Sequence, residues 1–135
     1  MKKCLILLVT IIMTASVMGC AATMNYTIGS VGNATATEKS MTYEEFQGKK
    51  EYKIKIGSEG AAILVNIVSE SGTLDASIIN DADETDIPYD GKELQTGSFS
   101  VNIKEEGTYC ITLTANHHKG SYSFLVTDLS EDTDN

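Results

Sequence analysis

A short acidic stretch is the densest group of chemically capable side chains in this sequence. Residues 80–86 (NDADETD) contain four acids within seven positions. Hard cations such as Ca²⁺ bind several oxygen ligands on flexible loops. The stretch therefore predicts a calcium site formed by Asp81, Asp83 and Asp86, with Asp90 as a further ligand. The EF-hand pattern does not match, because the sixth position is not glycine and the twelfth is not glutamate, and a solvated acidic loop explains the same residues.

The histidines and one cysteine are the other candidates for chemistry. His117 and His118 are adjacent, and no cysteine or carboxylate is spaced near them to complete a transition-metal set. Cys110 would need a nearby base and an electropositive setting to act as a nucleophile. No hydrolase, metalloprotease, phosphate-loop or dinucleotide motif occurs. We predict that His117 and His118 are turn residues. Cys110 is predicted to be a small packed thiol, with an intermolecular disulfide or a regulatory thiol as the alternative. We predict no catalytic residue and no enzymatic activity.

A different cysteine, Cys20, ends the one strongly apolar run of the chain. Two lysines precede an apolar core over residues 5–13, and small residues follow at 15, 16 and 19. This order is typical of a secretory signal, and the core is shorter than the ~20 residues of a membrane-spanning helix. We therefore predict residues 1–19 to be a signal peptide.

The end of this run resembles a lipobox. Val17-Met18-Gly19-Cys20 is similar to the aliphatic–variable–small–Cys motif of bacterial lipoproteins. The resemblance implies cleavage between Gly19 and Cys20 and a covalent diacylglycerol with palmitate on the Cys20 sulfur. It also implies a location on the bacterial cell membrane, lipid-anchored and facing outside the cytoplasm. The alternative is a chance cysteine in an ordinary signal.

The number of cysteines and the net charge limit which disulfides the protein can form and which ligands it can bind. Cys4 would leave with the signal and Cys20 would carry lipid, so Cys110 would have no partner for an internal disulfide. The chain has 10 lysines, no arginine and 19 acids, for a net charge of −9. Nucleic-acid binding is excluded as a function class, because phosphate contacts require clustered cationic side chains.

The remaining chain divides into three parts. Residues 20–37 are predicted to be the lipidated N-terminus and a flexible tether, because the residues after Cys20 are small, polar and rich in Gly and Thr. Residues 128–135 contain four acids and no aromatic residue, which predicts a disordered tail. Residues 38–127 are predicted to be the folded domain.

This domain shows the period-two alternation of half-buried β-strands. Phe99, Val101 and Ile103, for example, alternate with polar residues, and glycine-containing breaks separate the runs. The predicted strands cover residues 38–46, 49–56, 61–69, 73–80, 94–103, 108–116 and 120–127. The fold class is all-β, with a single antiparallel β-sandwich of about seven or eight strands.

Two segments carry a second resemblance. Residues 107–113 (GTYCITL) and 120–124 (GSYSF) are similar to the last strands of pre-peptidase C-terminal-type and related jelly-roll domains of exported bacterial proteins. The resemblance implies a jelly-roll-like accessory or binding module and carries no catalytic residue.

Together these features predict a membrane-anchored extracytoplasmic lipoprotein. Its β-sandwich would be a non-catalytic binding or envelope-accessory module for a protein or carbohydrate ligand. The alternative is a structural or protein-interaction domain that docks on a larger cell-surface or transporter complex. No cofactor is predicted besides the covalent lipid and the calcium ion considered above.

Overall fold

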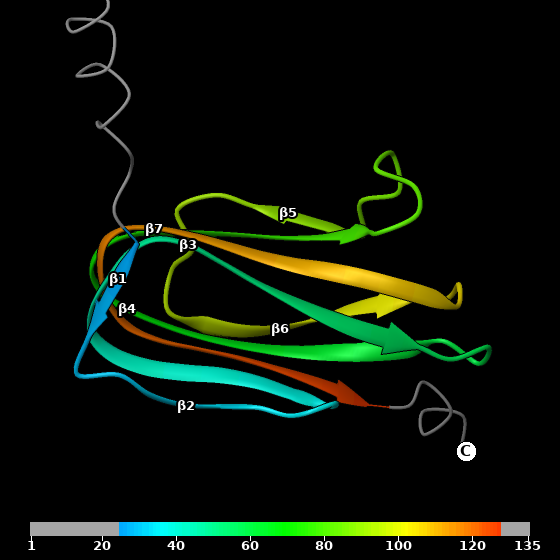
Figure 1. Ribbon diagram of the computed structural model, residues 1–135, viewed down its shortest axis with the longest axis horizontal. Coiled ribbons are helices and arrows are strands. Elements are labelled where there is room, and N and C mark those ends of the chain that lie inside the picture. The colour runs from blue at the N-terminus through cyan, green and yellow to red at the C-terminus, as the bar shows by residue number, and fades with distance from the viewer. Residues whose placement is uncertain (1–24, 128–135) are drawn as a thin grey trace, which may run out of the picture.

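The computed structural model describes residues 25–127, and they form one antiparallel sheet of seven strands (Figure 1). The strands are β1 (Tyr26–Ile28), β2 (Val31–Ala34), β3 (Glu38–Ile56), β4 (Ala61–Asn80), β5 (Tyr89–Gly91), β6 (Gly97–Ile103) and β7 (Gly107–Thr127). This confirms the predicted all-β class. In this part of the chain no helix is long and apolar enough to cross a membrane.

Strands β3, β4 and β7 have 19, 20 and 21 residues, about three to four times the length of an ordinary strand, and each of them bends near its middle. The pairing of β3 with β7 shifts register between Tyr43 and Gly48, and the pairing of β4 with β7 shifts between Ser69 and Thr73. Extra residues of this kind bend a strand and increase its twist. The bends line up and fold the sheet over on itself, as Figure 1 shows. We call this line the corner.

Folding at the corner produces the two layers of a β-sandwich. The β6 layer has the order β2, first half of β3, second half of β7, first half of β4, β6. The β5 layer has the order second half of β3, first half of β7, second half of β4, β5. Contacts across the interior join them: the Tyr52 and Tyr122 hydroxyl oxygens lie 2.6 Å apart, and the Tyr89 and Phe99 ring centroids lie 5.0 Å apart.

The core consists of the inward residues of both layers. The alternation predicted for residues 108–116 and 120–127 is confirmed, since Tyr109, Ile111, Leu113, Tyr122 and Phe124 are all buried. Burying a large apolar side chain contributes about 1.5–3 kcal/mol, so this core is the main source of stability in a domain whose cysteine at position 110 is free.

The number and ends of the strands differ from the prediction. Six predicted strands join pairwise into β3, β4 and β7, because pairing continues through residues 47–48, 70–72 and 117–119 where we expected turns. Glycine marks both turns and strand bends, and the sequence pattern does not distinguish them. The predicted strand 94–103 begins at Gly97, and β5 was not predicted because three residues show no periodicity.

The predicted tether also differs in part from the structure. Residues 26–28 and 31–34 form β1 and β2, and both pair with β3. These strands are too short for a detectable alternation, and their residues pair with residues between 5 (Ala34 with Lys39) and 21 (Tyr26 with Gln47) positions further along the chain. The signal peptide predicted for residues 1–19, the predicted cleavage and lipidation site at Cys20 and the tail predicted for residues 128–135 lie outside the described residues.

Candidate binding face

The outer face of the β6 layer is covered by small hydroxyl and amide side chains. They alternate with the buried residues of four strands and therefore point away from the core. We call this surface the hydroxyl face. Its polar members are Ser40, Thr42, Asn66, Ser98, Ser100, Asn102, Ser121 and Ser123, and its apolar members are Leu64, Val68 and Leu125.

Strand register arranges these residues in rows across the layer. One row runs from Ser40 on β3 to Ser123 on β7, then to Asn66 on β4 and Ser98 on β6. The Ser98 hydroxyl donates a hydrogen bond to the Asn66 Oδ1 atom. Facing residues of neighbouring strands lie about 4.5–5.5 Å apart, so each row is a regular line of polar groups.

Apolar side chains lie beside this row. Leu64 and Leu125 face each other on adjacent strands and are 40% and 37% exposed, and Val68 is 42% exposed. Glu38, next to Leu125, is the only charged outward side chain in these rows within the described residues. A surface that is both apolar and hydrogen-bonding, with so little charge, suits contact with another uncharged surface.

The outer face of the β5 layer is charged instead. Lys49, Glu51, Lys53 and Lys55 point outward from β3, opposite three threonines and Cys110 on β7. Lys49 pairs with Glu51 at 3.2 Å, and Lys53 pairs with Asp81 at 2.9 Å. These groups are well exposed, and exposed pairs contribute only about 0–1 kcal/mol each.

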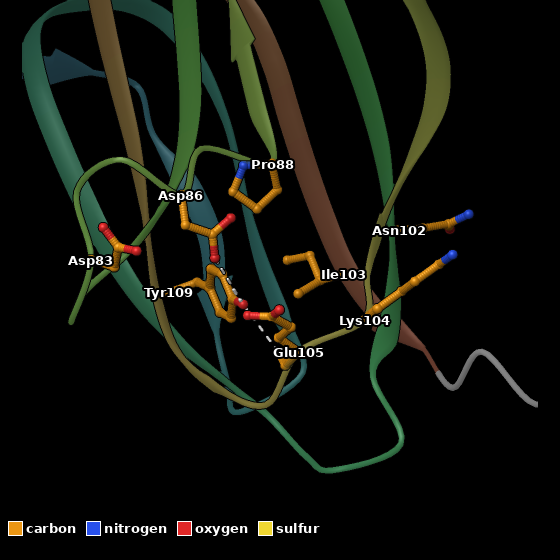
Figure 2. A pocket seen from close by; sticks show the side chains of 8 residues that line it. All are labelled: Asp83, Asp86, Pro88, Asn102, Ile103, Lys104, Glu105 and Tyr109. Carbon is orange, nitrogen blue, oxygen red and sulfur yellow. Dashed lines mark hydrogen bonds between the residues drawn. The ribbon is translucent and has the colours of Figure 1, made fainter.

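A cleft of about 420 Å³ lies at the end of the sandwich away from the corner. Figure 2 shows the Asp86 and Glu105 carboxylates near the Tyr109 hydroxyl, with Asp83 apart from them. Tyr109 donates hydrogen bonds to the Glu105 carbonyl oxygen at 3.0 Å and to Asp86 Oδ2 at 3.5 Å. Burial, and then the negative charges of Asp86 and Glu105, raise the pKa of Tyr109. The hydroxyl therefore stays protonated where Tyr109 lines the cleft.

The structure does not bring the predicted calcium ligands together. Asp81 accepts hydrogen bonds from Lys53, Asp83 accepts them from the backbone and side chain of Thr85, and Asp86 accepts one from the Asn80 amide. Asp90 lies 3.7 Å from Lys92. Across residues 25–127 no three histidine, cysteine or carboxylate side chains are grouped to hold a metal ion. The calcium site stays a prediction without support from this geometry.

The two histidines lie at the corner, within β7 and not in a hairpin turn. His117 is exposed, has a φ of +46°, and places Nδ1 3.2 Å from Glu45. His118 is fully buried; its Nδ1 lies 2.6 Å from the Tyr43 hydroxyl and its Nε2 3.0 Å from the Ser69 hydroxyl. Burial lowers the pKa of His118. A neutral imidazole has one donor and one acceptor nitrogen, and the two hydroxyls satisfy both.

Cys110 lies on the charged outer face and is half-buried. Its sulfur is 3.7 Å from the Thr112 hydroxyl, and its strand neighbours are Lys53 and Ile79. It is a free thiol at the surface of the sheet, outside the core.

Sequence reasoning missed the hydroxyl face and the contacts of His118. The alternation of serine and asparagine with apolar residues indicates which side chains of each strand point outward. It does not indicate that the outward residues of four strands lie side by side in rows, because that depends on strand register. Tyr43 and Ser69 are 75 and 49 residues from His118, so no local pattern connects them.

No protein-family model matches the chain, and no curated protein shows significant similarity to it.

Proposed function

We propose that this protein is a bacterial lipoprotein held outside the cytoplasm by lipid on Cys20, and that its β-sandwich is a non-catalytic binding or envelope-accessory module. The lipobox-like residues 17–20 support the anchor. The hydroxyl face supports the binding role, and it is the single observation on which that role rests.

The anchor would hold the domain close to the bilayer. The first strand of the described residues, β1, begins at Tyr26, so residues 21–25 alone separate Cys20 from it in the sequence. Five residues span at most about 18 Å when fully extended. The folded part would therefore remain near the lipid headgroups, within reach of other envelope components.

The chemistry of the hydroxyl face suggests how the module binds. Serine and asparagine donate and accept hydrogen bonds, and the apolar contact of Leu64 with Leu125 supplies area that can be dehydrated. The face has little charge, so binding would depend on shape and hydrogen bonds and would change little with salt.

A second observation supports a non-catalytic role. The Ser69–His118–Tyr43 chain has the residue types of a relay for activating a hydroxyl nucleophile. However, His118 is completely buried among core residues, so its imidazole cannot pass a proton to the leaving group of a substrate at Ser69. The chain instead satisfies polar groups at the corner.

Labelling with a palmitate analogue tests the anchor. We expect the full chain, expressed in bacterial cells, to incorporate the label and to fractionate with membranes. Cys20→Ser should lose both properties, whereas Cys110→Ser should keep them. Label that persists in the Cys20→Ser variant would refute lipid attachment at Cys20.

A matched pair of lysine substitutions tests the binding face. A glycan array and a pull-down with the anchored protein would first identify the ligand. Asn66→Lys introduces charge at the centre of the hydroxyl face, and Thr114→Lys introduces it on the opposite outer face; both positions are exposed. We expect Asn66→Lys to reduce binding tenfold or more, about 1.4 kcal/mol, and Thr114→Lys to leave it unchanged. The reverse pattern would move the binding site to the β5 layer.

A further inference from the structure

Strand β6 is an open edge of the sandwich. It pairs with β4 on one side, and within residues 25–127 no other strand pairs with it. Its outward residues Ser98, Ser100 and Asn102 are exposed. Phe99, which packs on Tyr89 of the other layer, remains only partly buried at this edge. The free backbone groups of such a strand can pair with another chain.

The other edges of the described sheet are protected against such pairing. The second half of β3 carries Lys49, Lys50, Lys53 and Lys55, and lysines on an edge oppose association. Strand β5 has three residues and is flanked by charged side chains, and β1 and β2 have only three and four residues. Strand β6 has seven residues, and no charged residue occurs from Leu94 to Ile103.

The distribution of charge indicates which kind of strand could pair with the β6 edge. The chain has a net charge of −9, so two copies repel each other at most contacts. At the β6 edge they would meet through uncharged residues only. We propose that two copies of this chain pair edge to edge through β6, in antiparallel orientation, and join their β6 layers into one continuous sheet. This pairing goes beyond the proposed function and does not require the lipid anchor.

The strand is compatible with pairing to itself. In an antiparallel pair, a two-fold axis midway between the two copies of Ser100 places these two residues opposite each other. Ser98 then lies opposite Asn102 of the second copy, and Phe99 lies opposite Val101. Every pair then joins side chains of the same face, so hydroxyl and amide groups meet outside and apolar groups meet inside. The two hydroxyl faces come to lie on the same side of the joined sheet and form one surface twice as wide.

Register provides a direct test by disulfide formation. Facing Cα atoms of antiparallel strands lie about 4.5–5.5 Å apart, which is within the range of a disulfide. The full chain with Cys4→Ser and Cys110→Ser, expressed in bacterial cells, would be the parent, and Ser100→Cys would be added. Under mild oxidation we expect a dimer on a non-reducing gel, with a yield about tenfold or more above that of the controls, because pairing holds the two thiols at high effective concentration.

Two controls separate pairing from random collision. The parent reports any dimer formed through Cys20. Thr42→Cys places an exposed thiol on the same face but three strands away from the edge. A dimer yield for Ser100→Cys no higher than that for Thr42→Cys would overturn the proposal, and so would a cross-link to a different polypeptide.

A second variant tests the pairing without disulfide chemistry. Ser100→Lys places two lysines against each other on the two-fold axis. A photo-cross-linker that does not react with amines would trap the dimer, so that the added lysine does not change the reaction itself. We expect Ser100→Lys to abolish the trapped dimer, whereas Thr42→Lys should retain it. An equal yield of dimer in both lysine variants would contradict β6 pairing.

Discussion

His118 shows at the residue scale how a polar side chain is accommodated in a hydrophobic corner. Tyr43 and Ser69 each contact one of its ring nitrogens, and the Tyr43 and His118 rings lie 5.6 Å apart. Loss of either hydroxyl would leave a buried nitrogen without a partner, at a cost of about 1–3 kcal/mol. These two contacts therefore fix the orientation of the ring, and burial lowers the pKa of His118, which favours its neutral form.

This neutrality predicts a pH-dependent stability. Burial lowers the pKa of His118 in the folded state, so the unfolded chain binds more protons below its ordinary pKa of about 6.5. The contribution of His118 is complete above that pH and is lost as the pH falls toward the folded-state pKa, by at most about 1.4 kcal/mol per pH unit. We expect denaturant unfolding to show a steeper loss of stability below pH 6.5 in the wild type than in His118→Gln.

Thr114→Gln is the control, because Thr114 is exposed on β7 and the substitution changes no titratable group. It should retain the pH slope of the wild type below 6.5. A His118→Gln variant with an unchanged slope would show that other groups cause the acid sensitivity.

At the element scale, the corner depends on close backbone contacts between the bent strands. Gly120 has a φ of +147°, and a Cβ atom at this position would lie 1.8 Å from the Val68 carbonyl oxygen. Gly72 has a φ of +73°, and a Cβ there would lie 2.1 Å from the His117 carbonyl oxygen. The bends of β4 and β7 therefore require glycine for two reasons, conformation and space.

Substitution of Gly120 should distinguish this requirement from ordinary glycine effects. We expect Gly120→Ala to lower the free energy of unfolding by more than about 3 kcal/mol, since positive φ and the clash with backbone add together. Gly97→Ala at the start of β6 should change it by no more than about 1 kcal/mol, because a Cβ there meets no atom within 4 Å. Similar losses in the two variants, measured by thermal or urea unfolding, would contradict a tightly packed corner.

At the scale of the whole molecule, negative charge surrounds an uncharged edge. Loss of residues 1–19 would remove two lysines and no acid, which makes the repulsion between copies stronger. The proposed β6 contact contains no charged pair, so salt should weaken the repulsion without weakening the contact.

This predicts the direction of the salt effect on association. In isolated membranes, we expect the rate of Ser100→Cys cross-linking to rise several-fold between about 0.05 and about 0.5 M salt, as the screening length shortens from about 14 Å to about 4 Å. The Thr42→Cys rate serves as the control for collisions. A Ser100→Cys rate that falls with salt would indicate an interface built on opposite charges, which the β6 edge does not offer.

The sequence by itself determined the all-β class and which face is buried along the strands that alternate regularly. Alternation over several residues is sufficient for this, because side chains in a strand point to opposite faces in turn. It identified Phe99, Val101, Tyr109 and Tyr122 as inward and Ser98, Ser100 and Ser123 as outward before any pairing was known.

Only the tertiary structure decided how the strands continue and what their outward residues form. Glycines at 48, 72 and 120 were expected in turns, yet long-range hydrogen bonds with neighbouring strands carry the backbone through them. The hydroxyl rows, the Ser69–His118–Tyr43 contacts and the open edge of β6 all depend on register between distant segments. The local alternation determines which face of a strand is buried, but it does not determine which residues of a distant strand lie opposite, because that choice depends on pairing across the sheet and packing across the core.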